Sequence, residues 1–148
     1  MRKIIIIFLF VNTAVLNPVF ADDVQKTIEY GYGLEAVWLL PFPYLEIGAN
    51  IENTPLAIRQ KISYVIGVAY ESTEMSYKKL FNDKYDLFLA FNAVATIDLI
   101  GVGVQTGIDI PREKKGRFWR LGLAYEKLKY YNKYDYQFIP IAGVEYRF

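Results

Sequence analysis

Apolar residues recur at every second position along most of the chain after residue 26, with polar or small residues between them. In the segment 28–38, Ile, Tyr, Leu, Ala and Trp occupy one face, and mainly Glu and Gly occupy the other. A period of two is typical of a β-strand whose faces meet different surroundings, and no segment has the 3.6-residue period of a helix. The pattern covers seven segments: 27–38, 45–52, 58–71, 85–97, 100–110, 119–126 and 134–148. The sequence therefore predicts an all-β chain.

An eighth strand is predicted over 73–81, where Thr73, Met75 and Tyr77 alternate with polar residues. Single-chain bacterial barrels have even strand numbers, so that both ends of the chain lie on one side. We therefore expect an antiparallel up-and-down barrel of eight strands, with a two-residue turn at 71–72. The alternative is seven strands with a long loop over 72–84. The eight-stranded arrangement gives longer loops at the end where the first strand begins and the last one ends than at the other end, against the usual asymmetry of membrane barrels.

The glycines indicate which face points inward. Nine of the ten lie on the polar face, at 31, 33, 48, 67, 101, 103, 107, 122 and 143. The interior of a small closed barrel is crowded, and glycine relieves that crowding. On the apolar face, charged residues fall near predicted strand ends, where long stems reach a membrane surface: Lys26, Lys79, Arg117, Lys127 and Lys129. Aromatic residues predicted to form a girdle there are Trp38, Tyr44, Tyr70, Tyr85, Trp119 and Tyr134. We therefore predict a transmembrane β-barrel with its apolar face toward lipid.

The polar face carries the candidate site, a network of charges inside the barrel. Its predicted members are Glu29, Glu35, Glu46, Glu52, Arg59, Lys61, Asp86, Asp109, Arg120, Glu126, Glu145 and Arg147. Buried charges must pair, because an isolated one costs several kcal/mol. We expect a structural plug of salt bridges, since the lumen of an eight-stranded barrel is just filled by side chains. The excess of carboxylates leaves a narrow ion or small-solute conduit as an alternative.

The first 21 residues have the pattern of a cleavable secretory signal peptide. Arg2 and Lys3 precede a short apolar run, and the small residues Val19 and Ala21 occupy the positions before a cleavage site. The run is too short and too interrupted for a membrane-spanning helix. We therefore expect one β-barrel domain over 22–148, following a signal peptide over 1–21.

Composition excludes several kinds of chemistry. Hydrophobic residues make up 53% and charged residues 22%, and the formal net charge of +1 provides no basic field for nucleic acid. Histidine and cysteine are both absent, which excludes histidine-dependent catalysis, thiolate chemistry and disulfides. The one candidate nucleophile is Ser63 beside Lys61, a spacing that two polar lumen residues on one strand also explain. We predict no catalytic activity, no metal and no cofactor.

The end of the chain, Ala142-Gly143-Val144-Glu145-Tyr146-Arg147-Phe148, resembles the last strand of Gram-negative outer-membrane β-barrels. The chain as a whole resembles the small OmpA/OmpX-like class of these barrels. In that class the alternating Val144, Tyr146 and Phe148 look like the signal that the barrel-assembly machinery reads. The enzymes built on small outer-membrane barrels rely on an active-site histidine, which this chain lacks.

The resemblance implies a location in the outer membrane after export to the periplasm, and a monomer with a structural or surface-interaction role. The implied partners are outer-membrane lipid and lipopolysaccharide, with the secretion and barrel-assembly machinery during biogenesis. Basic residues between strands could contact lipopolysaccharide phosphates if they face outside, namely Lys78, Lys79, Lys84, Arg112, Lys114 and Lys115. A different class of function remains open, a soluble periplasmic β-barrel that binds an apolar ligand with its apolar face turned inward.

Overall fold

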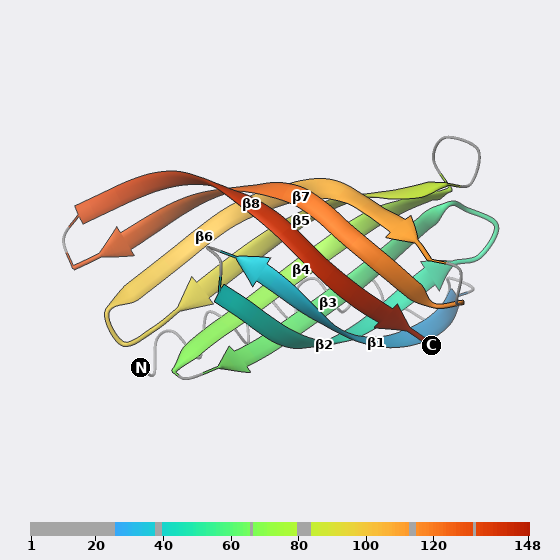
Figure 1. Cartoon of the computed structure of the whole chain (residues 1–148), viewed down its shortest axis with the longest axis horizontal. Helices are drawn as coiled ribbons and strands as arrows, with labels where there is room; N and C mark the ends of the chain where they lie inside the picture. Colours follow the sequence, from blue (N-terminus) through green and yellow to red (C-terminus); the bar gives the residue numbers. More distant parts are fainter. Residues whose placement is uncertain (1–25, 38–39, 66, 80–83, 113–114, 132) are drawn as a thin grey trace.

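The computed structural model of the chain is a closed barrel of eight antiparallel strands (Figure 1). It describes residues 26–37, 40–65, 67–79, 84–112, 115–131 and 133–148. The strands are β1 (Lys26–Val37), β2 (Leu40–Ile51), β3 (Leu56–Val65), β4 (Val68–Lys79), β5 (Tyr85–Ala95), β6 (Leu99–Pro111), β7 (Arg117–Tyr130) and β8 (Lys133–Arg147). The predicted all-β, eight-stranded, up-and-down barrel is confirmed. The predicted signal peptide and its cleavage residues Val19 and Ala21 lie outside the described residues.

Every strand pairs with its neighbours in sequence, and β1 closes the barrel against β8. Gly31 pairs with Arg147 across this closing seam. The row of partners that starts at Gly31 runs through Glu46, Lys61, Ser72, Asn92, Gly103 and Glu126 to Gln137. The row thus returns to β8 ten residues before Arg147 (147 − 137 = 10). This stagger requires strongly tilted strands, which enclose an interior only wide enough for side chains.

The connection between β3 and β4 differs from the prediction. The predicted turn at 71–72 is wrong, because β3 ends at Val65 and β4 already begins at Val68. Gly67 has a φ of 80°, a left-handed conformation that favours glycine in a tight turn. Val65 and Val68 are paired across this turn. The earlier turn reverses the faces of the first residues of β4, so Tyr70 points into the barrel.

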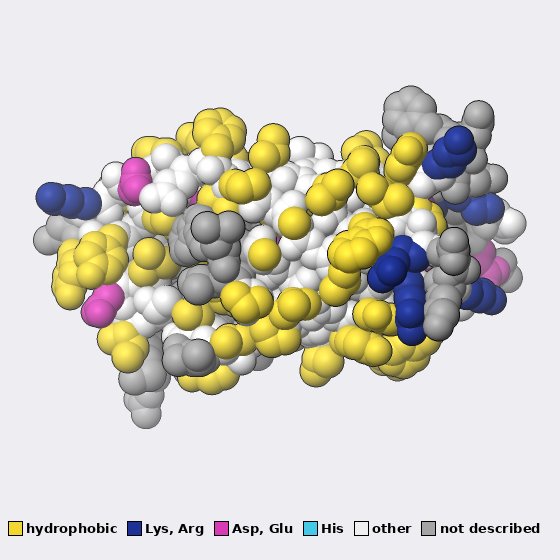
Figure 2. Space-filling view, viewed as in Figure 1, with side chains coloured by type: hydrophobic (Ala, Val, Ile, Leu, Met, Phe, Trp, Pro, Cys, Tyr) yellow, Lys and Arg dark blue, Asp and Glu magenta, His cyan; other side chains and the backbone are white. Residues whose placement is uncertain are grey.

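Polarity is inverted relative to a water-soluble protein. The outer surface exposes large apolar side chains in the middle of strands, including Leu45 at 72%, Tyr64 at 75% and Phe91 at 65% exposure. Figure 2 shows hydrophobic side chains spread over the wall of the barrel, with charged side chains of both signs toward its two ends. Inside, Arg59, Lys61 and Arg120 are at most 1% exposed. The predicted orientation of the two faces is thus confirmed.

The predicted aromatic girdle is only partly present. Trp119 and Tyr134 lie on the outer surface at 48% and 59% exposure, and Trp38 lies outside the described residues. The placement of Tyr44 and Tyr70 at the lipid face is wrong, because both point inward and are buried. Tyr44 shares the inward face of β2 with Glu46, two residues further along.

The two ends of the barrel have different connections. The amide of Tyr30 donates to the carbonyl of Phe148, so the start of β1 and the end of β8 meet at one end. The strands β2, β4 and β6 end, and β3, β5 and β7 begin, at that same end. The strands β1, β3, β5 and β7 end, and β2, β4, β6 and β8 begin, at the other. The β7–β8 hairpin is the longest and projects from that second end (Figure 1). Among the described residues, no helix is long and apolar enough to cross a membrane.

Candidate functional site: the charge network inside the barrel

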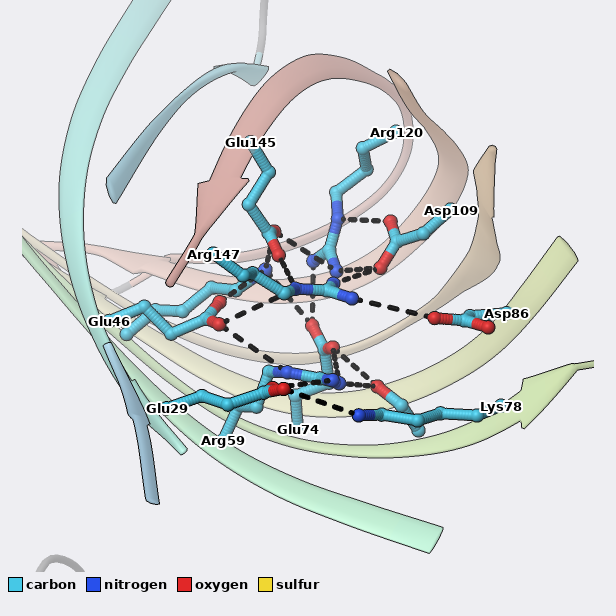
Figure 3. Close-up of polar contacts among 12 residues, drawn as sticks. Glu29, Glu46, Arg59, Glu74, Lys78, Asp86, Asp109, Arg120, Glu145 and Arg147 are labelled. Atoms are coloured by element: carbon cyan, nitrogen blue, oxygen red, sulfur yellow. Dashed lines mark hydrogen bonds and ion pairs between the residues drawn. The ribbon is translucent and has the colours of Figure 1, made fainter. Parts of the chain in front are cut away.

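The barrel encloses a network of charged side chains contributed by all eight strands (Figure 3). The inward-facing acidic residues are Glu29, Glu35, Glu46, Glu74, Asp86, Asp109, Glu126 and Glu145. The inward-facing basic residues are Arg59, Lys61, Lys78, Arg120 and Arg147. The eight acids exceed the five bases by three, so the described interior is acidic overall. The interior is therefore held together by charges that share partners rather than by isolated pairs.

Arg120 on β7 has the most complete set of contacts. Its Nε and Nη2 donate to the two carboxylate oxygens of Asp109 at 2.9 and 2.8 Å. Its Nη1 donates to Oε2 of Glu74 at 2.6 Å. The guanidinium also lies 4.0 Å from the centre of the Phe88 ring. A planar guanidinium suits such bidentate binding, and here it links β7 to β6 and, across the lumen, to β4.

Lys61 and Arg59 on β3 bind carboxylates and a hydroxyl group from other strands inside the lumen. Lys61 Nζ lies 3.0 Å from a carboxylate oxygen of Glu74 and 3.0 Å from one of Glu145. Arg59 Nη1 donates to the Ser76 hydroxyl at 2.5 Å, and its Nε lies 3.4 Å from Glu46. Strands that are far apart in the sequence are thereby connected through the lumen, which stabilises the closed barrel if every charge keeps a partner.

Arg147 and Glu145, near the C-terminus, complete the network. Arg147 contacts Glu145 on its own strand, and its Nη2 donates to Asp109 at 2.5 Å. Its Nη1 lies 3.5 Å from Asp86 on β5. Oε2 of Glu145 accepts a hydrogen bond from the Tyr44 hydroxyl at 2.7 Å. The last strand therefore supplies both an acid and a base to the centre of the plug.

Two predicted members lie at the margin of the network. Glu35 is 3.8 Å from Arg120 and accepts no hydrogen bond within the described part of the chain. Glu126 accepts one hydrogen bond from Asn92 at 2.7 Å and contacts no base among the residues described. Around them the buried residues are mainly uncharged, among them Phe42, Tyr70, Leu128 and the amide side chain of Gln105. The plug thus has a charged half toward the end of β8 and a mainly uncharged half toward the β7–β8 tip.

One predicted member is wrong. Glu52 is exposed in the turn after β2, which ends at Ile51, so it does not enter the lumen. The predicted network also lacked three residues that contact its members in the structure, namely Glu74, Lys78 and Tyr44. Alternation had already put Glu74 and Lys78 on the polar face of the tentative strand 73–81, which was the signal that could have included them.

Ser63 and Lys61, the candidate nucleophile and its neighbour, are each engaged by other groups. The Ser63 hydroxyl donates to the carbonyl of Pro43 at 2.5 Å, and Lys61 is occupied by three carboxylates. The proposed serine–lysine pair is therefore not formed. The described residues hold no group of three or more acids, cysteines or histidines placed to bind a metal ion.

The C-terminal residues compared with an assembly signal lie on the outside of the barrel. Phe148 is 75% exposed, and Tyr146 stacks on Tyr32 with ring centroids 5.1 Å apart. Val144 shares that outward face. These contacts place an aromatic cluster at the closing seam of β1 and β8, and the role of these residues in assembly stays a prediction.

Comparison with known proteins provides a likeness in fold. No protein-family model matches the chain, and no curated protein sequence matches it. Among solved structures, it is similar to Neisserial surface protein A, with 15% identity over 82% of this chain and 94% of that one, at a TM-score of 0.41. It is also similar to the Yersinia pestis outer membrane protein Ail in a phospholipid bilayer nanodisc, with 12% identity over 84% of this chain and 100% of Ail, at a TM-score of 0.43.

Proposed function

We propose that this protein is an integral outer-membrane β-barrel of a Gram-negative bacterium, without catalytic activity, that acts as a closed structural anchor in the envelope. The observation that supports this is the inverted polarity of the barrel. Arg120 is 1% exposed inside, while Leu45 is 72% exposed at the middle of β2. In water such an outer surface would favour aggregation, whereas in a bilayer it meets acyl chains.

The closed hydrogen-bond ladder supports the same proposal. A lipid-embedded sheet must leave no edge within the hydrocarbon region, and the barrel has continuous pairing from β1 through β8. The soluble alternative needs an apolar interior for its ligand. Instead, Arg59, Glu74 and Arg120 fill the lumen. The conduit alternative needs an open path, and these fully buried side chains obstruct it.

The end at which β1 begins and β8 ends faces the periplasm in this proposal, as the even strand number of the class implies. The outer end then has only short turns, apart from the projecting β7–β8 hairpin. The basic residues Lys84 and Lys115 lie in connections at the periplasmic end, so they do not meet lipopolysaccharide.

A matched pair of substitutions tests the membrane placement. Leu45→Arg puts a charge on the outward face in mid-strand, whereas Ile97→Arg puts the same charge in the β5–β6 turn, where Ile97 is 94% exposed. In a bilayer the first should cost about 2–4 kcal/mol of unfolding free energy and the second about 0–1 kcal/mol. Both would be nearly neutral in a soluble protein, because both side chains are exposed.

The readouts are urea unfolding in phospholipid vesicles and the gel mobility of membrane fractions with and without boiling in SDS. We expect a heat-shifted band in the outer-membrane fraction for the native chain and for Ile97→Arg, and less of it for Leu45→Arg. Equal stability of the two variants, or a soluble periplasmic protein without a heat shift, would refute the proposal. Ion conductance of the purified protein in planar bilayers would instead favour the conduit.

A further inference from the structure

The outward face of the β7–β8 hairpin carries lysines that stand over tyrosines. Lys127 pairs with Tyr136 across the two strands, and Lys129 pairs with Tyr134. Lys127 Nζ lies 4.8 Å from the centre of the Tyr134 ring and 5.5 Å from that of Tyr136, and Lys129 Nζ lies 5.7 Å from that of Tyr134. Both lysines are exposed. Both ammonium groups thus lie near the Tyr134 ring, which restricts the lysine side chains before binding and reduces the freedom they lose on binding.

The charge of these lysines is not neutralised by the protein. Among the described residues, no carboxylate lies within 4 Å of either ammonium group, in contrast to Lys61 with its three carboxylates. An outward-facing lysine is costly in the middle of a bilayer but nearly neutral at its surface. Lys127 and Lys129 lie close to the end of β7, which ends at Tyr130 next to the turn into β8. We therefore infer that both lysines lie at the membrane surface.

The surface directly below the lysines is aromatic and apolar. Tyr125 pairs with Phe138, their ring centroids are 4.8 Å apart, and Phe138 is 77% exposed. On the neighbouring strand, Val102 pairs with Lys127 and is 55% exposed. Two cations thus stand above a wall that suits hydrocarbon. This arrangement complements a molecule with phosphates at one end and acyl chains at the other.

We propose that Lys127 and Lys129, braced by Tyr134 and Tyr136, bind the phosphate groups of lipopolysaccharide in the outer leaflet, while Phe138 and Tyr125 contact its acyl chains. This inference rests on the proposed function, because it needs the hairpin at the outer surface of the membrane. Lysine ammonium groups bind phosphates through charge-assisted hydrogen bonds, and each lysine near an anionic lipid surface adds appreciably to binding. The site gives the barrel a preferred lipid on one side of its wall.

The test compares two double variants of the full-length protein in nanodiscs. Lys127→Gln/Lys129→Gln removes the proposed site, and Lys84→Gln/Lys115→Gln removes the same charge from exposed lysines at the opposite end. Each protein is titrated with the phosphorylated lipid A portion of lipopolysaccharide, with its dephosphorylated form and with phosphatidylglycerol, and the bound lipid is counted by native mass spectrometry.

We expect the first variant to bind phosphorylated lipid A about thirty-fold more weakly and the control to bind it like the native chain. Loss of binding on raising the salt concentration and weak binding of the dephosphorylated form are also expected. Tyr134→Leu/Tyr136→Leu should weaken binding less, because both ammonium groups remain.

Equal binding by the two lysine variants, or undiminished binding of the dephosphorylated lipid, would overturn the site. Equal affinity for phosphatidylglycerol would overturn its assignment to lipopolysaccharide. The heat-shift assay on the same samples keeps this result separate from the proposed function, since a barrel without the lipid site still shifts.

Discussion

Replacing Arg120 by Met removes the guanidinium that the interior depends on most, while keeping a long unbranched stem. Arg120 is 1% exposed and donates two hydrogen bonds to Asp109 and one to Glu74. Removing one partner of a buried ion pair costs about 3–5 kcal/mol, because the remaining charges are left without compensation. The imbalance of three inward acids over bases becomes four in the variant, with eight acids and four bases. We therefore expect Arg120→Met to lose about 3–5 kcal/mol of unfolding free energy.

Two further variants separate charge pairing from lost volume. Asp109→Asn/Arg120→Met has seven acids and four bases, which restores the imbalance of three, so it should be more stable than Arg120→Met alone. Arg117→Met changes the same residue type on the same strand, but this guanidinium lies over the Tyr146 ring at 5.0 Å, so its loss should cost less than about 1 kcal/mol.

The assay is urea unfolding in phospholipid vesicles, followed by tryptophan fluorescence. Trp119 is a suitable reporter because it is 48% exposed on the outer surface and leaves lipid on unfolding. An Arg120→Met barrel as stable as Arg117→Met would refute the reasoning. A double variant no more stable than Arg120→Met would show that Arg120 and Asp109 do not act as a pair.

Further predictions concern the wall and the end of the chain. Gly33→Ala should cost about 1–3 kcal/mol in urea unfolding, because the added Cβ would lie 2.4 Å from the Tyr44 hydroxyl oxygen; an unchanged midpoint would contradict this. Tyr44→Phe should cost about 1.5–3 kcal/mol in the same assay, because the buried Glu145 loses a donor at 2.7 Å. Gly67→Ala should cost about 1–2 kcal/mol at its φ of 80°, and Gly67→Asn less, with equal losses arguing against backbone strain. Phe148→Ala should reduce the heat-shifted band in cells while leaving the refolded barrel within about 0.5 kcal/mol of the native chain, since Phe148 is 75% exposed; an equal yield in cells would remove its role in assembly.

The strands that were predicted well are those in which inward and outward positions alternate without interruption from one end of the strand to the other. In β6 and β7 alternation alone separates outward Val102 and Leu121 from inward Asp109 and Arg120. Period-two patterns report the face of a residue directly, because successive side chains point to opposite sides of a sheet. The eight-stranded count followed from the same pattern together with the need for closure.

The errors arose where a turn was hidden in an apolar run. Residues 62–70 read as one strand because the apolar alternation continues across Gly67. This stretch contains no proline and no pair of polar residues that would mark the turn. Placing the turn five residues late reversed the faces of residues 68–71, because Val68 and Tyr70 point inward and Ala69 and Glu71 point outward. The remainder of β4 returned to the predicted alternation.

The partners within the charge network could not be predicted from the sequence. Lys61 and Glu145 are 84 residues apart, and their contact depends on the stagger of the whole barrel rather than on local spacing. Alternation shows that both point inward, but it does not show at which depth. That information enters only when the register of all the strand pairs is known.

The position of Glu145 and Arg147 near the end of β8 has a consequence for quality control in the cell. Without these two residues, Lys61 on β3 and Asp109 on β6 each lack one of their lumen partners. A chain truncated even a few residues early would close around uncompensated charge, if it closed at all. The network thus makes an intact end of β8 a condition of stability, so products that lack Glu145 and Arg147 should be cut by proteases more readily than the native barrel.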